Sequence, residues 1–183
     1  MSSAVSDELA ERLRATVRDI PDFPEPGILF KDITPVLADP ELFPAVVKAL
    51  AEPFGAESID RVVGIESRGF IFAAPLAISA GAAFVPIRKP GKLPHRTLRV
   101  EYQLEYGTDA LEAHVDAIRP GDRVLLVDDV LATGGTAAAA VSLIERLGGH
   151  LVGTAFVVEL AALGGRERLP GLPVHSLLRF AIG

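Results

Sequence analysis

The strongest candidate for chemistry is the segment VLLVDDVLATGGTA, residues 124–137. An apolar run that predicts a buried strand ends in two carboxylates, Asp128 and Asp129, and a short loop then leads into an Ala-rich helix. In open α/β sheets, ligands bind at the carboxyl ends of the strands, and a Gly-rich turn at a helix N-terminus presents free backbone N–H groups to a phosphate. Two carboxylates just before such a loop can accept hydrogen bonds from a sugar diol. The segment therefore predicts a site for a phosphorylated sugar.

The loop itself has the composition that close approach to a phosphate requires. Glycines let the backbone come near the ligand, and threonines add hydroxyl donors. The loop residues are Ala132, Thr133, Gly134, Gly135 and Thr136. The alternative is that this segment has only a structural role, because the two Asp residues could cap a turn and the two Gly residues could belong to a common βα loop. Two other phosphate-binding modes are disfavoured, since the sequence has neither GxxxxGK[ST] nor GxGxxG.

Length, charge and cysteine content narrow the class of protein. A chain of 183 residues favours one domain over residues 1–183. The excess of 24 Asp and Glu over 18 Lys and Arg gives a net charge of -6, which disfavours nucleic acid as a partner. The chain has no cysteine, which excludes disulfides, thiolate metal sites and a thiol nucleophile, and favours a reducing compartment. We therefore expect a cytoplasmic protein.

A long uncharged run, residues 69–87, raises the question of a membrane span. It contains two prolines and several small residues, and basic residues flank it closely. We interpret it as a buried helix over 70–79 followed by a strand over 83–87. The N-terminal residues are acidic and amphipathic, without the pattern of a secretory signal. We expect no association with a membrane.

The apolar pattern predicts an alternation of strands and helices. Apolar residues at helical spacing predict a helix over 6–20, and four prolines predict a long ordered loop over 21–35. The strands read as continuous apolar runs, which is typical of a parallel sheet covered on both faces. The further elements are a helix over 40–52, strands over 61–65, 83–88, 123–127 and 151–158, a helix over 135–147 and a candidate strand over 174–180.

One segment departs from this alternation. From Leu98 to Tyr106, apolar and polar residues alternate strictly, and the alternation resumes at Leu111 after a Gly-Thr-Asp turn. This period of two predicts an antiparallel hairpin with one polar face, inserted into a parallel-sheet domain.

The 124–137 segment resembles the phosphoribosyl pyrophosphate motif of the type I phosphoribosyltransferases, in which two acidic residues hold the ribose hydroxyls and the ATGGT loop holds the 5′-phosphate. Other stretches are similar to the adenine phosphoribosyltransferases, in the family's order and spacing: FPEPGILFKDITP (23–35), GIESRGFIF (64–72), IRKPGKLP (87–94) and LEYGTD (104–109). The resemblance implies the type I fold, a central parallel sheet flanked by helices, with an N-terminal hood at about 21–35 and a hairpin lid at about 90–116.

The resemblance also implies roles for single residues. The loop with Ser67 and Arg68, in which relatives often have a non-proline cis peptide bond, would bind pyrophosphate, and so would the basic residues Arg88, Lys89 and Lys92. A charge run at a strand end is, however, more often a solvated surface. Glu105 matches the family's catalytic carboxylate, and Arg68 would also be catalytic, because it would act on the leaving pyrophosphate. Periodicity alone would make Glu105 an exposed residue of the polar face of the hairpin.

The adenine pocket of the family maps to Leu29, Lys31 and Leu160. The implied reaction transfers the 5-phosphoribosyl group from phosphoribosyl pyrophosphate to adenine and releases AMP and pyrophosphate. Mg²⁺ would be carried by the pyrophosphate donor, with no direct protein ligand, and the protein would be a homodimer like its relatives. Two alternatives remain open: transfer to another purine base, and a regulatory protein of the same fold that only senses the donor.

Overall fold

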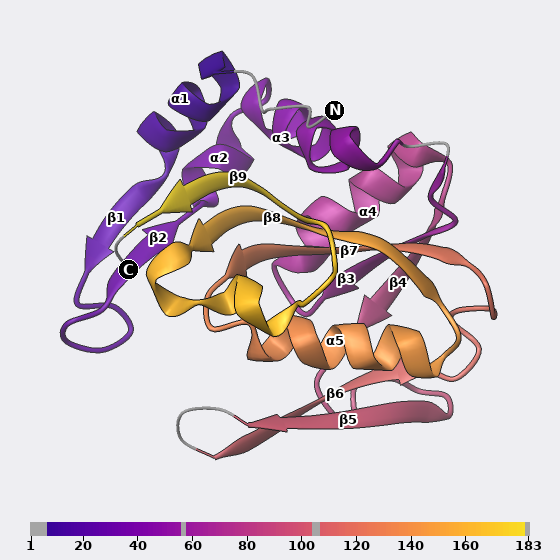
Figure 1. Ribbon diagram of the computed structural model, residues 1–183. Coiled ribbons are helices and arrows are strands. Elements are labelled where there is room, and N and C mark those ends of the chain that lie inside the picture. Colours follow the sequence, from indigo (N-terminus) through magenta and orange to yellow (C-terminus); the bar gives the residue numbers. More distant parts are fainter. Residues whose placement is uncertain (1–6, 56–57, 104–106, 182–183) are drawn as a thin grey trace.

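A five-stranded sheet forms the centre of the computed structural model, which describes residues 7–55, 58–103 and 107–181 (Figure 1). Its order is β4-β3-β7-β8-β9, and every neighbouring pair is parallel. The strands are β3 (Arg61–Ile65), β4 (Ala83–Ile87), β7 (Arg123–Leu131), β8 (His150–Leu160) and β9 (Val174–Phe180). The parallel α/β sheet that the sequence predicts is therefore confirmed, with β7 in the middle.

Helices cover both faces of this sheet (Figure 1). Because successive strand residues point to opposite faces, Val62 packs in the cluster that holds Phe72, whereas Val63 packs in the cluster that holds Leu143. The first face is covered by α1 (Asp7–Thr16), α2 (Thr34–Ala38), α3 (Leu42–Ala51) and α4 (Gly69–Ala80), and the second by α5 (Gly135–Arg146). Short 3-10 helices are η1 (Glu52–Phe54), η3 (Ala161–Leu163) and η4 (Gly165–Arg168).

The predicted hairpin is confirmed in the part of it that the structure describes. Strands β5 (Thr97–Gln103) and β6 (Thr108–His114) pair antiparallel and lie along α5 (Figure 1). The apolar side of β5, with Leu98 and Val100, packs on the same cluster as α5. Two backbone hydrogen bonds of 2.9 and 2.8 Å between Arg88 and Glu112 fix the hairpin to the end of β4.

Two predictions for the N-terminal region are wrong. The helix expected over 6–20 ends at Thr16, and residues 18–21 form β1 (Arg18–Pro21). The loop expected over 21–35 contains β2 (Leu29–Asp32), which pairs antiparallel with β1, and the start of α2. The antiparallel pairing of β1 with β2 across residues 22–28 outweighs the helical spacing of the apolar residues, because the context of a residue can override its local propensity.

The end of β7 also differs from the prediction. The strand expected over 123–127 continues to Leu131, so that Asp128 and Asp129 lie within it rather than after it. The reason is the neighbouring strand, since β8 remains paired with β7 up to Leu131 and Glu159. The helix expected from residue 40 begins at Leu42, where the Asp39 carboxylate accepts the backbone N–H of Leu42 at 2.9 Å.

The uncharged run of residues 69–87 forms α4 and β4, as the sequence predicts. Among the described residues, no helix combines the length and the apolar character needed to cross a lipid bilayer.

Candidate active site

A cavity of about 520 Å³ opens at the carboxyl edge of the sheet, beside the ends of β3 and β7. Segments far apart in the sequence meet here, as expected for an open α/β sheet. The cavity is lined by Ile28, Leu29, Phe30, Lys31, Glu66, Ser67, Arg68, Lys89, the whole of 128–137 and Leu160. The structure thus brings together the predicted sugar-phosphate motif, the Ser67–Arg68 loop, Lys89 and the three residues predicted to hold adenine.

Residues 132–136, the phosphate loop, lead from β7 into α5. Gly134 stands immediately before the helix with φ +81°, a left-handed conformation that favours glycine. Helical hydrogen bonding begins with the 2.9 Å bond from the Ala138 N–H to the Gly134 carbonyl. The N–H groups of the first turn therefore have no partner within the helix, and they face the cavity end of α5, where a phosphate can accept them.

Asp128 and Asp129 form an acidic pair beside the phosphate loop. The Asp129 backbone N–H donates to the Asp128 carboxylate at 2.9 Å, and the Asp129 side chain, only 8% exposed, binds the Nε of Arg68. Desolvation raises the pKa of the Asp128 carboxyl, and the negative charge of Asp129 raises it further. The pair presents adjacent carboxylate oxygens to the cavity, an arrangement that can hold two neighbouring hydroxyl groups.

Arg68 lies at the N-terminus of α4, three residues after the end of β3. Its guanidinium lies 5.6 Å from the centre of the Phe30 ring as well as against Asp129, so it connects the acidic pair with the hood. The Glu66–Ser67 peptide bond that precedes it is cis and non-proline, as the family resemblance implies. Half of the Arg68 side chain remains exposed toward the cavity, where it can meet an anion.

Sequence reasoning missed Glu66, which binds all three basic residues of 88–92, here called the basic segment. Its carboxylate accepts the Lys89 backbone N–H at 3.0 Å and the Arg88 Nε at 3.3 Å, and it also binds the Lys92 ammonium. Arg88 and Lys92 are not among the described residues that line the cavity, and they reach its edge through Glu66. The available signal was the position of Glu66 between a buried strand and the Ser67–Arg68 loop.

These contacts make protein stability depend on the ionisation of Glu66. Desolvation alone would raise its pKa, but the hydrogen bonds from Lys92, Lys89 and Arg88 outweigh desolvation and lower the pKa to about 2. A carboxylate with a lowered pKa stabilises the fold fully above its ordinary value of 4.5, and this contribution disappears as the pH falls toward about 2.

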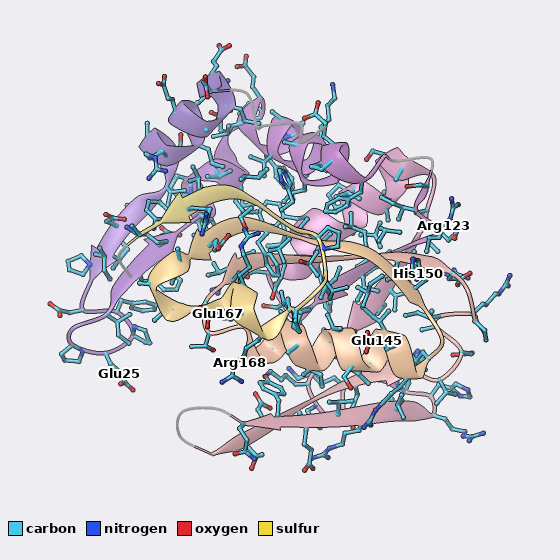
Figure 2. The ribbon with its side chains drawn as sticks, viewed as in Figure 1. Glu25, Arg123, Glu145, His150, Glu167 and Arg168 are labelled. Atoms are coloured by element: carbon cyan, nitrogen blue, oxygen red, sulfur yellow. The ribbon has the colours of Figure 1, made fainter. Side chains whose placement is uncertain are left out.

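We therefore expect Glu66→Gln to lower the free energy of unfolding by about 2 kcal/mol at pH 7, as is usual for loss of hydrogen bonds to a charged group. The difference from the unchanged protein should shrink steadily between pH 5 and pH 3. Urea unfolding across this range measures it. Glu25→Gln, a change of an exposed hood residue (Figure 2), is the matched control and should show little effect at any pH. A pH-independent difference for Glu66→Gln would contradict the assignment.

Lys89 connects the basic segment with the hairpin. Its ammonium donates to the Tyr102 hydroxyl at 2.9 Å and binds the Asp109 carboxylate. Desolvation opposes the charge of Lys89, but the bonds to Asp109 and Tyr102 prevail and raise its pKa. The Tyr102 hydroxyl also accepts from the Thr136 hydroxyl at 3.4 Å. The hairpin is thereby linked to the phosphate loop through Tyr102, a residue that periodicity identified only as apolar.

The other end of the cavity is an apolar slot between the hood and the end of β8. It is lined by Leu29 and Leu160, two of the residues predicted to hold adenine, together with Ile28 and Phe30. Lys31 also lines the cavity, but its ammonium binds the Asp19 carboxylate at 2.6 Å and lies 4.2 Å from the centre of the Phe180 ring. The Lys31 ammonium thus links β1 and β2 to β9, which leaves apolar side chains to contact a flat ligand.

Glu105, the remaining predicted site residue, lies outside the described residues. Its predicted catalytic role stays a prediction.

A parallel sheet with a glycine-containing phosphate loop and an acidic pair at its carboxyl edge defines a phosphoribosyl transferase domain, and the family model of that description matches residues 33–169. Among phosphoribosyltransferases, the chain belongs to the adenine phosphoribosyltransferases. The adenine phosphoribosyltransferase of Acidothermus cellulolyticus is 62% identical over 172 residues, which cover 94% of this chain and 97% of that protein.

Solved structures agree with this assignment. The crystal structure of adenine phosphoribosyltransferase from Rhodothermus marinus has a TM-score of 0.90 and 59% identity, and the match covers 94% of this chain and 99% of that one. The Saccharomyces cerevisiae enzyme, crystallised with adenine and an imino-altritol bisphosphate, has a TM-score of 0.89 and 44% identity, with coverage of 93% and 99%. The type I fold predicted from the motifs is confirmed.

Proposed function

We propose that this chain transfers the 5-phosphoribosyl group from phosphoribosyl pyrophosphate to adenine, giving AMP and pyrophosphate in purine salvage. One observation carries the proposal: a single cavity joins the phosphate loop, the acidic pair and Arg68 to the apolar slot of Leu29 and Leu160. A ribose held between these parts has its phosphate on the α5 N-terminus, its hydroxyls on the carboxylates and its anomeric carbon between the cations and the base. The membership of the family supports the choice of adenine as the base.

The proposed chemistry follows from the charges that form during transfer. Departure of pyrophosphate leaves positive charge at the anomeric carbon and negative charge on the leaving oxygens, and an enzyme accelerates the step by stabilising both. Arg68 and Lys89 line the cavity and would meet the leaving group there, whereas Arg88 and Lys92 add positive charge at the edge of the cavity, where Glu66 holds them. Asp128 and Asp129 hold the ribose and lie near the developing positive charge.

Two further roles belong to the loop and the hairpin. The phosphate loop, including Thr133 and Thr136, fixes the 5′-phosphate and so orients the ribose for attack by the base. The hairpin acts as a lid that excludes water, which would otherwise hydrolyse the donor. Glu105 assists removal of the purine proton or stabilises the cationic centre.

Mg²⁺ would be carried by the pyrophosphate of the donor, with no direct protein ligand. The carboxylates of Asp128 and Asp129 at the cavity suit an ion held in this way, because they bring negative charge close to it. When bound, the ion neutralises pyrophosphate charge. The described residues include no group of three or more side chains that could hold a metal ion by themselves.

We further propose that residues 1–183 act as a single domain, that the protein is a homodimer like the family it belongs to, and that it works in the cytoplasm. The absence of cysteine from the sequence favours a reducing compartment. Sedimentation or light scattering of the full chain tests the dimer.

We expect the chain to form AMP from adenine and the donor only with Mg²⁺ present, and to use adenine far better than hypoxanthine or guanine. The need for Mg²⁺ follows from the proposal that the donor carries this ion. The preference for adenine rests on the apolar slot of the cavity, in which backbone groups near Lys31 would read the edge of the base. A competition assay with the three bases, with EDTA as the metal-free arm, measures both expectations. Equal rates with a 6-oxopurine would overturn the choice of base, and donor binding without AMP formation would favour a sensor instead.

A further inference from the structure

Glu159 is a buried carboxylate next to the phosphate loop but outside the cavity. It is paired in the sheet with Leu131, the last residue of β7, and its side chain is 3% exposed. It accepts hydrogen bonds from Arg166 Nε at 3.1 Å and Nη2 at 2.5 Å and from the Ser176 hydroxyl at 2.7 Å, and Arg179 Nε lies 3.3 Å away. The bidentate ion pair with Arg166 has the geometry of a strong, directional interaction.

Arg166 belongs to η4, the segment that returns from β8 toward β9. Its Nη1 donates to the Val174 carbonyl at 2.8 Å, so one guanidinium fixes η4 to both strands. The far end of the segment is fixed as well, because Leu169 is buried against Leu131, Ala137 and Phe156. In Figure 2, Glu167 and Arg168 of η4 lie at one end of α5, opposite Glu145.

The residue before Arg166 contacts the phosphate loop directly. A Cβ on Gly165 would lie 2.2 Å from the Ala132 carbonyl oxygen and 3.1 Å from the Gly134 nitrogen. A Cβ on Gly134 would lie 2.4 Å from the Gly165 carbonyl oxygen. The two backbones therefore touch without room for a side chain, and the position of Gly165 limits where the loop can lie.

We propose that Glu159 and Arg166 are positioning residues for the phosphate loop, which they hold through Gly165 in the arrangement that receives the 5′-phosphate. This inference rests on the proposed function for the identity of the ligand. It assigns to a buried ion pair behind the cavity a role in affinity for every ligand that carries a 5′-phosphate. Adenine and pyrophosphate, which lack that group, do not depend on it.

The test replaces Arg166 by Met, which keeps the length of the side chain and removes its hydrogen bonds. We expect the KM for the donor and the Kd for AMP and for ribose 5-phosphate to rise at least tenfold, while the KM for adenine and the Kd for pyrophosphate stay within twofold. Arg168→Met, an exposed change in the same helix (Figure 2), is the matched control and should leave all five values unchanged. Arg166→Lys should recover part of the loss.

Gly165→Ala tests the same contact with the ion pair left in place, and we expect the same phosphate-specific loss of affinity. A merely structural role would lower the thermal midpoint and weaken all ligands alike, and that result would overturn the inference. Unchanged ribose 5-phosphate affinity in a folded Arg166→Met or Gly165→Ala variant would also overturn it. Failure of the unchanged chain to make AMP would overturn the proposed function instead, because calorimetry with ribose 5-phosphate does not require turnover.

Discussion

Gly134→Ala is expected to weaken donor binding by at least about 100-fold, which corresponds to the loss of about two hydrogen bonds to a charged phosphate. Two physical effects combine here. The φ of +81° is unfavourable for any residue with a Cβ, and the new Cβ would lie 2.4 Å from the Gly165 carbonyl oxygen. The loop must therefore move, and its N–H groups would no longer converge on the place proposed for the 5′-phosphate. Titration of the donor by calorimetry measures the change.

Gly121→Ala separates the two effects. Gly121 has a similar φ of +86°, but nothing lies within 4 Å of its would-be Cβ. This control bears the same backbone penalty far from the cavity, so it should lower the stability while donor affinity stays normal. If both variants lose donor affinity equally, close approach of the loop is not what holds the phosphate.

Glu105→Gln is expected to lower kcat by on the order of 10² to 10⁴, the usual range for a positioned acid–base group, while donor affinity stays nearly normal. The reason is that a group which acts only in the transition state contributes little to binding in the ground state. Single-turnover formation of AMP gives the rate, and donor titration gives the affinity.

The matched control is Glu101→Gln, which changes an exposed carboxylate of the same hairpin whose partner is Arg99 at 3.0 Å. It should leave both quantities unchanged. Full turnover by Glu105→Gln, or a loss of donor affinity as severe as that of Gly134→Ala, would contradict a catalytic role on the lid.

The central sheet could be predicted from the sequence because its signals are local. Continuous apolar runs mark β3, β7 and β8, and the glycines before α5 mark the phosphate loop, so these signals alone place the acidic pair and the loop at one edge of the sheet. The ribbon of β1 and β2 could not be predicted, because its pairing joins segments on either side of a proline-rich turn. The helical spacing of Val17 and Ile20 predicts a longer helix, but the strand pairing of this segment prevails.

The residues that support the site were harder to predict than those that line it. Lys31 owes its burial to Asp19 and Phe180, and Phe180 is distant in the sequence. Glu66 binds cations that follow β4, and Glu159 binds Arg166 of η4. Each depends on a side-chain pairing that the fold creates, and neither the periodicity nor the local motifs of the sequence contain that pairing.

The ribbon of β1 and β2 has a consequence for how the cavity responds to thermal motion. A two-stranded ribbon is marginal by itself, and local opening of a protein begins where the fewest strands and the least apolar packing hold the backbone. The phosphate loop, by contrast, continues from β7, which has a paired strand on each side. Amide hydrogens of β7 should therefore exchange with solvent only through global unfolding, whereas those of β1 and β2 exchange through local opening. If the cavity is used as proposed, we expect the half lined by β2 to admit and release a ligand while the half formed by β7 and the phosphate loop stays folded.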